Sequence, residues 1–263
     1  MIIWTIATNT LREQIRDKVL YNILLFALVM ILSAIALGQL TLGHEDKVIV
    51  DLGLTCISVF GTLIAIFIGT SLVYKEIEKR TVYALLAKPV RRSDFILGKY
   101  LGLLSTLFLN VVIMTAGLIM TLMWQGGARF HQYSMLIPAV YTIFLALALT
   151  TALALLFSTF STPALSAIFA FFLWVIGHFS ADLLAFGALA KIRLVRWLCT
   201  FLYYILPNLS NFDALNGVGV IRNAAHYGSV DFAAMGWVTL YALIYSGILL
   251  ALAMVIFCRR EFK

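Results

Sequence analysis

The chain has 263 residues, of which 63% are hydrophobic and only 12% are charged, about half the charged share of an average soluble protein. Even a well-packed domain of this length leaves about a quarter of its unfolded surface exposed, so a composition with a mean hydropathy of +1.01 excludes an ordinary soluble fold. The formal charge of +7 is not gathered in a basic domain outside the apolar runs, so no nucleic-acid partner is expected.

Residues 1–18 precede the first apolar run and have the pattern of an amphipathic helix. Its two faces carry Trp4, Leu11 and Ile15 on one side and Arg12, Glu13, Arg16 and Asp17 on the other. We expect this helix to lie in the inner membrane interface, and the alternative is a cytoplasmic extension of the first span. The small residues Ala34 and Ala36 resemble a signal-peptide cleavage site, but the preceding segment is longer than a usual n-region, so no cleavage is expected.

Six apolar runs are long enough to cross a hydrocarbon core of about 30 Å as helices. They cover residues 19–40, 50–73, 100–124, 136–157, 164–186 and 232–258. Asp51 and Asp182 are their only formally charged residues. Because backbone groups in lipid must bond within their own segment, each run is predicted to be a transmembrane helix.

The orientation follows from the basic residues, which are retained on the cytoplasmic side of a membrane. An N-terminus on the inside leaves only a minority of the 19 lysines and arginines in outer segments: Lys47, Arg129, Lys191, Arg193, Arg196 and Arg222. We therefore expect both termini to be cytoplasmic.

The inner connection between the second and third runs, residues 74–99, contains a short helical pattern. Val82, Leu85 and Leu86 form an apolar patch at i, i+3 and i+4, and Pro89 ends the helix. Ser93 and Asp94 provide an N-cap and a first-turn acid for the next helix. A ring of mixed charge surrounds the patch: Glu76, Glu78, Arg80, Arg91 and Arg92. Either a protein partner binds this patch, or the patch packs on the protein's own helix ends while lipid phosphates neutralise the arginines.

The outer connection, residues 187–231, is unusually apolar. Residues 197–206 would form a helix of about 15 Å, half of a membrane, so this segment cannot span it. Pro207 and Asn208 interrupt it, and residues 209–215 suggest a second short element. We predict a pair of short helices that enter the outer leaflet or cover the outer face. The candidate outer gate consists of Tyr203, Tyr204, Pro207 and Asn208.

His178 and Asp182 are four residues apart in the fifth run, so on one continuous helix they would share a face. Together with Asn110 they are candidates for a translocation path, the first two as a proton or cation site. The alternatives are that Asp182 is a solvated carboxylate near the headgroups and that Asn110 bonds a neighbouring helix. Gly98 and Gly102 form a GxxxG pair, which indicates either a helix contact or a chance match.

No resident metal or catalytic centre is expected. Three histidines fall in predicted outer segments without the spacing of metal ligands: His44, His131 and His226. Cys56, Cys199 and Cys258 lie far apart without a CxxC pair, and we interpret them as small hydrophobic residues. No nucleophile with an oriented base is recognisable.

Several residues of the inner connection, in this order and spacing, carry a resemblance to a family: Glu76, Thr81, Leu85-Leu86, Pro89-Val90, Arg92 and Gly98-Lys99. The connection closely resembles the loop after the second span of bacterial ATP-binding-cassette exporter permeases of the type-2 membrane family, in particular the branch associated with multicopper enzyme maturation. The resemblance covers the full length, including LPNLSNFD at residues 206–213 and the basic tail at 259–262. Arg80 departs from the family, which commonly has Gly before the threonine.

The resemblance implies an all-α integral membrane protein of the bacterial inner membrane, similar to type V exporters. It would have six transmembrane helices, an N-terminal interfacial helix, a cytoplasmic coupling helix and re-entrant outer helices before the last span. We predict a single permease domain over residues 1–263, with 1–18 as the interfacial helix, 74–99 as the coupling loop and 187–231 as the outer re-entrant segment.

The same resemblance implies a transport subunit that is not itself an enzyme. The sequence has no GxxxxGK[ST] motif, so ATP and Mg²⁺ are expected to bind a separate cytoplasmic ATPase, present in two copies with a second permease copy or a paralogue. In such families the loop after the second span docks on the ATPase. The residues implied for coupling are Glu76, Glu78, Arg80, Thr81, Val82, Leu85, Leu86, Pro89 and Arg92. Val82, Leu85 and Leu86 would form the apolar anchor.

The almost uncharged runs favour a lipid-like or amphipathic cargo over a hydrophilic ion, and membrane lipid is an expected partner. Two other functions stay open. One is a non-transporting component that passes force from the ATPase to a periplasmic or envelope partner. The other is a membrane-embedded enzyme that uses His178 and Asp182.

Overall fold

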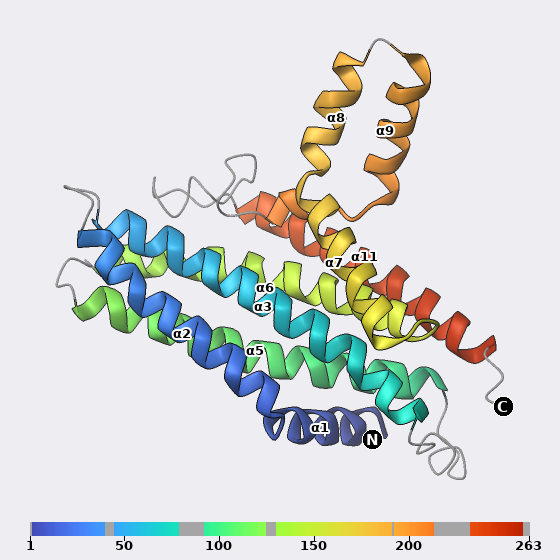
Figure 1. Ribbon diagram of the computed structural model, residues 1–263, viewed down its shortest axis with the longest axis horizontal. Helices are drawn as coiled ribbons and strands as arrows, with labels where there is room; N and C mark the ends of the chain where they lie inside the picture. The colour runs from blue at the N-terminus through green and yellow to red at the C-terminus, as the bar shows by residue number, and fades with distance from the viewer. Residues whose placement is uncertain are drawn as a thin grey trace.

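The computed structural model describes residues 2–39, 45–78, 92–124, 130–190, 192–212 and 232–259. These ranges are helical apart from short links (Figure 1), and no strand occurs among them. The helices are α1 (Ile2–Ile15), α2 (Lys18–Gln39), α3 (Glu45–Glu78), α5 (Arg92–Trp124), α6 (Phe130–Ser158), α7 (Pro163–His178), α8 (Ser180–Leu189), α9 (Arg193–Ile205), the 3₁₀ helix η1 (Leu209–Phe212) and α11 (Phe232–Arg259).

The long helices α2, α3, α5, α6 and α11 form a bundle with α3 and α6 near its centre (Figure 1). Small residues let α3 approach α6 closely. A Cβ atom at Gly61 would lie 2.7 Å from Leu147 Cδ1, and one at Gly69 would lie 2.9 Å from the Ala154 Cβ atom. Such close contacts between small residues are typical of helices that pack within a membrane, where no hydrophobic force drives association.

Within the described ranges, four helical segments are long and apolar enough to cross a membrane: Val48–Ser71, Arg92–Trp124, Leu136–Ser158 and Ala233–Arg259. They coincide with the second, third, fourth and sixth predicted spans, and these elements are confirmed as long apolar helices. The first predicted span is one helix, α2, whose apolar part within the described side chains is Ile23–Ser33. The complete six-span layout stays a prediction.

The fifth predicted span, residues 164–186, is wrong as a single helix. The chain is helical from Pro163 to His178, and a second helix begins at Ser180. Phe179 joins them with φ −89° and ψ 12°, outside the α-helical region. The 16 residues of α7 reach about 24 Å, less than the hydrocarbon core. The continuous apolar run did not reveal the break, because Phe179 at the break is itself apolar.

The interruption sends α8 away from the bundle. Helices α8 and α9 pack against each other as an antiparallel hairpin that projects from the bundle (Figure 1), here called the α8–α9 hairpin. The predicted pair of short elements, residues 197–206 and 209–215, corresponds to α9 and η1. Helix α8 was not predicted as a separate element, because most of it falls within the fifth predicted span. Helix α1 and the last turn of α11 lie towards the same end of the molecule (Figure 1). The side of the membrane that they face stays a prediction.

Candidate functional site

Two sets of long-range contacts involve α11, one at its last turn and the other at Tyr241 in its first half. The first set surrounds the opening turns of α5, from Arg92 to Gly102, and is called the α5 junction. The guanidinium Nη1 of Arg92 donates hydrogen bonds to the carbonyl oxygens of Phe257 and Cys258, at 3.2 and 3.0 Å. These carbonyls belong to the last turn of α11, where no further helical N–H is available and the helix dipole favours a cation. The rings of Phe95 and Phe257 also stack, with centroids 5.8 Å apart.

Helix α1 packs on the same turns of α5 through the glycine pair. A Cβ atom at Gly98 would lie 2.7 Å from the Cβ atom of Ile6. One at Gly102 would lie 2.6 Å from Thr10 Cβ and 2.8 Å from the Ala7 carbonyl oxygen. Any side chain at these positions would therefore push α1 away. The GxxxG pair is confirmed as a helix contact, with α1 as its partner.

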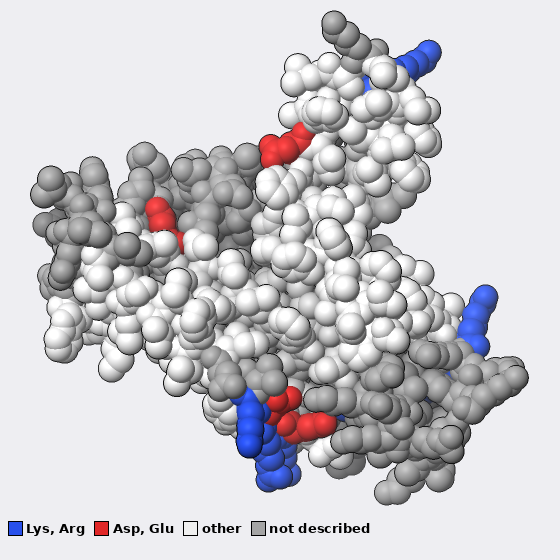
Figure 2. Space-filling model, in the orientation of Figure 1, with Lys and Arg blue, Asp and Glu red and all other residues white. Residues whose placement is uncertain are grey.

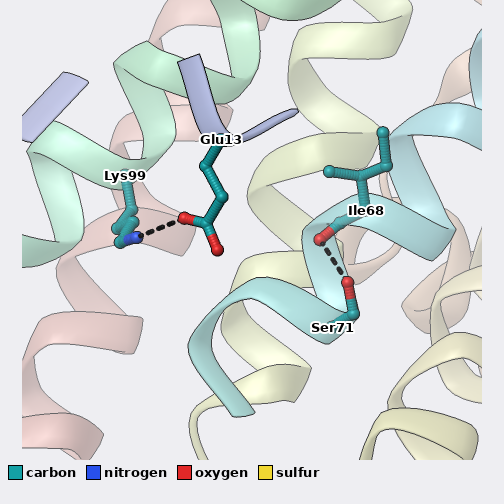
Figure 3. Close-up of polar contacts among 4 residues, drawn as sticks. All are labelled: Glu13, Ile68, Ser71 and Lys99. Atoms are coloured by element: carbon teal, nitrogen blue, oxygen red, sulfur yellow. Dashed lines mark hydrogen bonds and ion pairs between the residues drawn. The ribbon is translucent and has the colours of Figure 1, made fainter. Parts of the chain in front are cut away.

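An ion pair between α5 and α1 also holds α1 against α5. Lys99 is only 1% exposed, and its Nζ atom lies 3.8 Å from Oε2 of Glu13, which is half-exposed (Figure 3). The same ammonium group lies 5.8 Å from the centroid of the Phe95 ring. Because a buried charge is costly without a counter-charge, α1 contributes electrostatically to the α5 junction. Figure 3 also shows Ser71, whose hydroxyl instead donates to the Ile68 carbonyl of its own helix at 3.2 Å.

The face of α1 that contacts α5 was not singled out by the amphipathic pattern. The buried residues of α1 are Ala7, Thr10 and Gln14, whereas Trp4 is 73% exposed. Small side chains are needed here because the glycines bring the two helices so close. The buried atoms Thr10 Oγ1 and Gln14 Oε1 have no hydrogen-bond partner among the described residues.

The predicted coupling residues are placed only in part. Glu76 and Glu78 lie in the last turn of α3, and Arg92 opens α5 in the contact with α11. The other predicted coupling residues fall outside the described residues: Arg80, Thr81, Val82, Leu85, Leu86 and Pro89. The structure thus defines the two helices that flank the segment.

The second set of contacts joins α8, α9, η1 and α11 around Asn208 and is called the Asn208 cluster. Oδ1 of Asn208 accepts hydrogen bonds from the hydroxyls of Ser180 and Ser210, at 2.7 and 2.6 Å. Its Nδ2 donates to the Tyr203 hydroxyl at 3.3 Å, and its backbone N–H donates to the Tyr241 hydroxyl at 2.8 Å. Asn208, Ser180 and Ser210 are buried. Through its side chain and its backbone N–H, Asn208 therefore connects the start of α8, the end of α9 and Tyr241 of α11.

Some of the residues predicted for an outer gate meet in this cluster, while their role as a gate stays a prediction. Tyr203 and Asn208 are hydrogen-bonded, and the carbonyl oxygen of Pro207 would lie 2.7 Å from a Cβ atom at Gly177. Tyr204 instead points outward and is 77% exposed, with its ring edge-on to Tyr203 at 5.5 Å.

Sequence reasoning missed three members of the cluster: Ser180, Ser210 and Tyr241. Ser180 and Tyr241 lay within predicted spans, where a single polar residue carries no signal of a distant partner.

His178 and Asp182 lie on different helices, because the helix is interrupted at Phe179 between them, and their role as a proton or cation site stays a prediction. The Nδ1 atom of His178 lies 2.9 Å from the Trp174 carbonyl oxygen, one turn back in α7. Asp182 is exposed in the first turn of α8. Within the described parts of the chain, no three His, Cys, Asp or Glu side chains gather as metal ligands.

Asn110 does not bond a neighbouring helix through its Nδ2 group, which donates to the Thr106 carbonyl of its own helix at 2.8 Å. Its Oδ1 atom is buried without a hydrogen-bond partner in the described structure. The expected contact with another helix is therefore wrong for Nδ2, and the proposed place of Asn110 on a translocation path stays a prediction.

An apolar groove of about 410 Å³ lies between α5 and α6. Its lining includes Phe108, Val112, Ile119, Ile137 and Phe144. Beside it, the hydroxyls of Tyr141 and Thr239 are hydrogen-bonded at 2.9 Å, which connects α6 to α11. No charged side chain contributes to the groove, so it suits hydrocarbon.

Comparison with known proteins identifies the class of molecule that has this arrangement. Residues 4–262 match the family described as "ABC-2 family transporter protein". The "Probable ABC transporter permease protein NosY" of Pseudomonas aeruginosa is 31% identical over 284 aligned positions, which cover 98% of this chain and 98% of the relative.

Proposed function

The chain belongs to the ABC-2 family of transporter proteins, and from that premise we propose that it is the permease subunit of an ATP-driven exporter in a bacterial inner membrane. It is a membrane component of an ABC transporter, and in such systems the ATPase activity resides in a separate subunit. We propose that the complete unit contains two ATPase copies, which bind ATP and Mg²⁺, and a second permease copy or a paralogue. Both termini would face the cytoplasm.

The observation that carries the coupling proposal is the α5 junction. The segment from residue 79 to 91 is flanked by the end of α3 and the start of α5. Because α1 and α11 are both attached to the first turns of α5, a force applied to this segment would reach three helices. We propose that residues 76–92 dock on the ATPase, with Val82, Leu85 and Leu86 as the anchor.

The Asn208 cluster supports an outer gate. It connects the base of the α8–α9 hairpin to α11, so a movement of α11 relative to the hairpin would strain the hydrogen bond from the Asn208 N–H to the Tyr241 hydroxyl. Buried hydrogen bonds contribute about 0.5–1.5 kcal/mol each, which is small enough for an ATP-driven change to overcome.

The cargo that we propose is lipid-like or amphipathic. The apolar groove between α5 and α6 and the almost uncharged spans support this class over a hydrophilic ion. A second candidate is a mechanical component that passes force to an envelope partner, and the α8–α9 hairpin favours it because the hairpin projects from the bundle (Figure 1).

Co-purification with the cognate ATPase tests the coupling proposal. Leu85→Asp is expected to release the ATPase, because a carboxylate would be buried in the apolar contact. Leu189→Asp provides a matched control, since Leu189 is exposed at the far tip of the α8–α9 hairpin and its substitution should leave the ATPase bound. Retention of the ATPase by Leu85→Asp would remove the proposed anchor.

The cargo is tested separately in proteoliposomes that contain the complex and a fluorescent phospholipid. ATP-dependent movement of the probe between leaflets supports a lipid-like cargo. An ATPase-active complex that moves no probe would favour the mechanical role.

A further inference from the structure

The α8–α9 hairpin carries two kinds of exposed surface that no contact within the described chain covers. Its helices touch closely, since a Cβ atom at Gly187 would lie 2.9 Å from Cys199 Cβ. With 10 and 13 residues, α8 and α9 are about 15 and 20 Å long, so each is too short to cross a bilayer.

The first surface is apolar and lies on both helices. On α9 it includes Leu194, Trp197 and Phe201, and the rings of Trp197 and Phe201 stack with centroids 5.3 Å apart. On α8 it includes Phe186 and Leu189, the latter 83% exposed at the tip. Figure 2 shows the hairpin almost free of charged atoms on the side in view. Apolar surface on both helices of a projecting arm fits a surrounding hydrocarbon medium better than a single protein contact.

The second surface is a polar stripe along α9. Arg193, Arg196 and Thr200 follow one another at helical spacing and are exposed. The guanidinium Nη2 of Arg196 donates to the Ala190 carbonyl at 3.4 Å, which holds its side chain near the tip of the hairpin. The first turn of α9 contains no acidic residue, and Asp182 lies at the other end of the hairpin, in the first turn of α8. Figure 2 accordingly shows basic atoms near the tip.

We propose that the α8–α9 hairpin is a lipid-binding arm that recognises anionic phospholipids in the outer half of the bilayer. Its apolar side contacts acyl chains, and Arg193 and Arg196 bind the lipid phosphate, because guanidinium groups match phosphate oxygens in charge and geometry. An amphipathic helix with arginines on its polar face and tryptophan on the other is the usual form of such a surface. The inference goes beyond the transport function and does not depend on the cargo.

Trp197 provides a probe inside this surface. In a variant with Phe in place of Trp4, Trp124, Trp174 and Trp237, only Trp197 remains among the five tryptophans. The full chain is reconstituted in phosphatidylcholine vesicles that contain a fixed fraction of brominated phosphatidylglycerol or, separately, of brominated phosphatidylcholine. We expect bromine in the upper acyl chain to quench Trp197, and to quench it more strongly from phosphatidylglycerol because that lipid gathers around the arginines.

The double variant Arg193→Gln/Arg196→Gln is expected to lose the preference for phosphatidylglycerol. Its apparent affinity for this lipid should fall about fivefold per arginine. Quenching of Trp197 by brominated phosphatidylcholine should persist. The matched control Arg12→Gln/Arg16→Gln removes two exposed arginines from α1 and should leave the preference intact. If the four-fold Phe variant does not fold, the difference in quenching between the unmodified chain and Trp197→Phe gives the same measurement. Absence of quenching would place the hairpin in water or under a protein partner and overturn the proposal. Equal quenching from the two lipids would overturn the anionic preference.

Discussion

The close contact between α1 and α5 predicts a steric clash when Gly102 is replaced by alanine. In Gly102→Ala the new Cβ atom would lie 2.6 Å from Thr10 Cβ and 2.8 Å from the Ala7 carbonyl oxygen, whereas real Cβ contacts are essentially never below 3.0 Å. Because one of the two atoms is backbone, a rotamer change cannot relieve the clash and α1 must shift. Overpacking of this kind costs about 1–3 kcal/mol. Against this, replacing Gly by Ala within a helix gains about 1 kcal/mol of helix propensity.

The control for this prediction is Gly247→Ala in α11, because a Cβ atom there would meet nothing within 4 Å. The propensity gain is common to both variants, so the difference in their free energies of unfolding isolates the clash. We expect Gly102→Ala to be less stable than Gly247→Ala by about 1–3 kcal/mol in an SDS unfolding titration of the purified protein. Addition of Thr10→Gly to Gly102→Ala should recover part of the loss, since it removes one clashing side chain but leaves the Ala7 carbonyl. Equal stability of the two alanine variants would refute the docking of α1 through the glycine pair.

Four further variants test the polar contacts of the α5 junction and of the Asn208 cluster. Asn208→Leu leaves the buried hydroxyls of Ser180 and Ser210 without their acceptor. We therefore expect trypsin to cleave the α8–α9 hairpin about tenfold faster. Unchanged cleavage would contradict the role of Asn208. Arg92→Met should keep the ATPase bound but lower the ATP turnover of the complex about fivefold, the factor that corresponds to losing about 1 kcal/mol of interaction between Arg92 and α11. Normal turnover would exclude this contact from coupling. Glu13→Gln should destabilise the chain by about 1–2 kcal/mol in the SDS titration because it leaves the Lys99 ammonium buried without this counter-charge. Lys99→Met should be close to neutral, and a larger loss for Lys99→Met than for Glu13→Gln would reverse this interpretation.

The helices themselves were predictable because backbone N–H and C=O groups in lipid cannot form hydrogen bonds with water. An uncharged run of 20 or more residues must satisfy its N–H and C=O groups internally, and this alone predicts α2, α3, α5, α6 and α11 as long helices. The start of α5 was also visible, since Ser93 and Asp94 have the composition of a helix start and α5 begins at Arg92. Local chemistry determines both features.

The contacts that involve distant residues were not predictable from local chemistry. Hydropathy does not distinguish a continuous span at residues 164–186 from two helices, because Phe179 at the break is itself apolar. Directly after the break, Ser180 is hydrogen-bonded to Asn208, 28 residues later in the sequence. Similarly, GxxxG indicates a close helix contact but does not say that α1, rather than another span, is the partner of Gly98.

Helix α11 is the element that both sets of contacts share. Its last turn accepts the hydrogen bonds of Arg92, and its Tyr241 hydroxyl accepts the backbone N–H of Asn208. From Tyr241 to Phe257 the helix is uninterrupted, a distance of about 24 Å at 1.5 Å per residue. A continuous helix held at two separate points transmits an axial or tilting displacement between them with little loss, because bending it would break its own hydrogen bonds. A displacement of the α5 junction would therefore reach the base of the α8–α9 hairpin without a separate chain of side-chain rearrangements between the two ends.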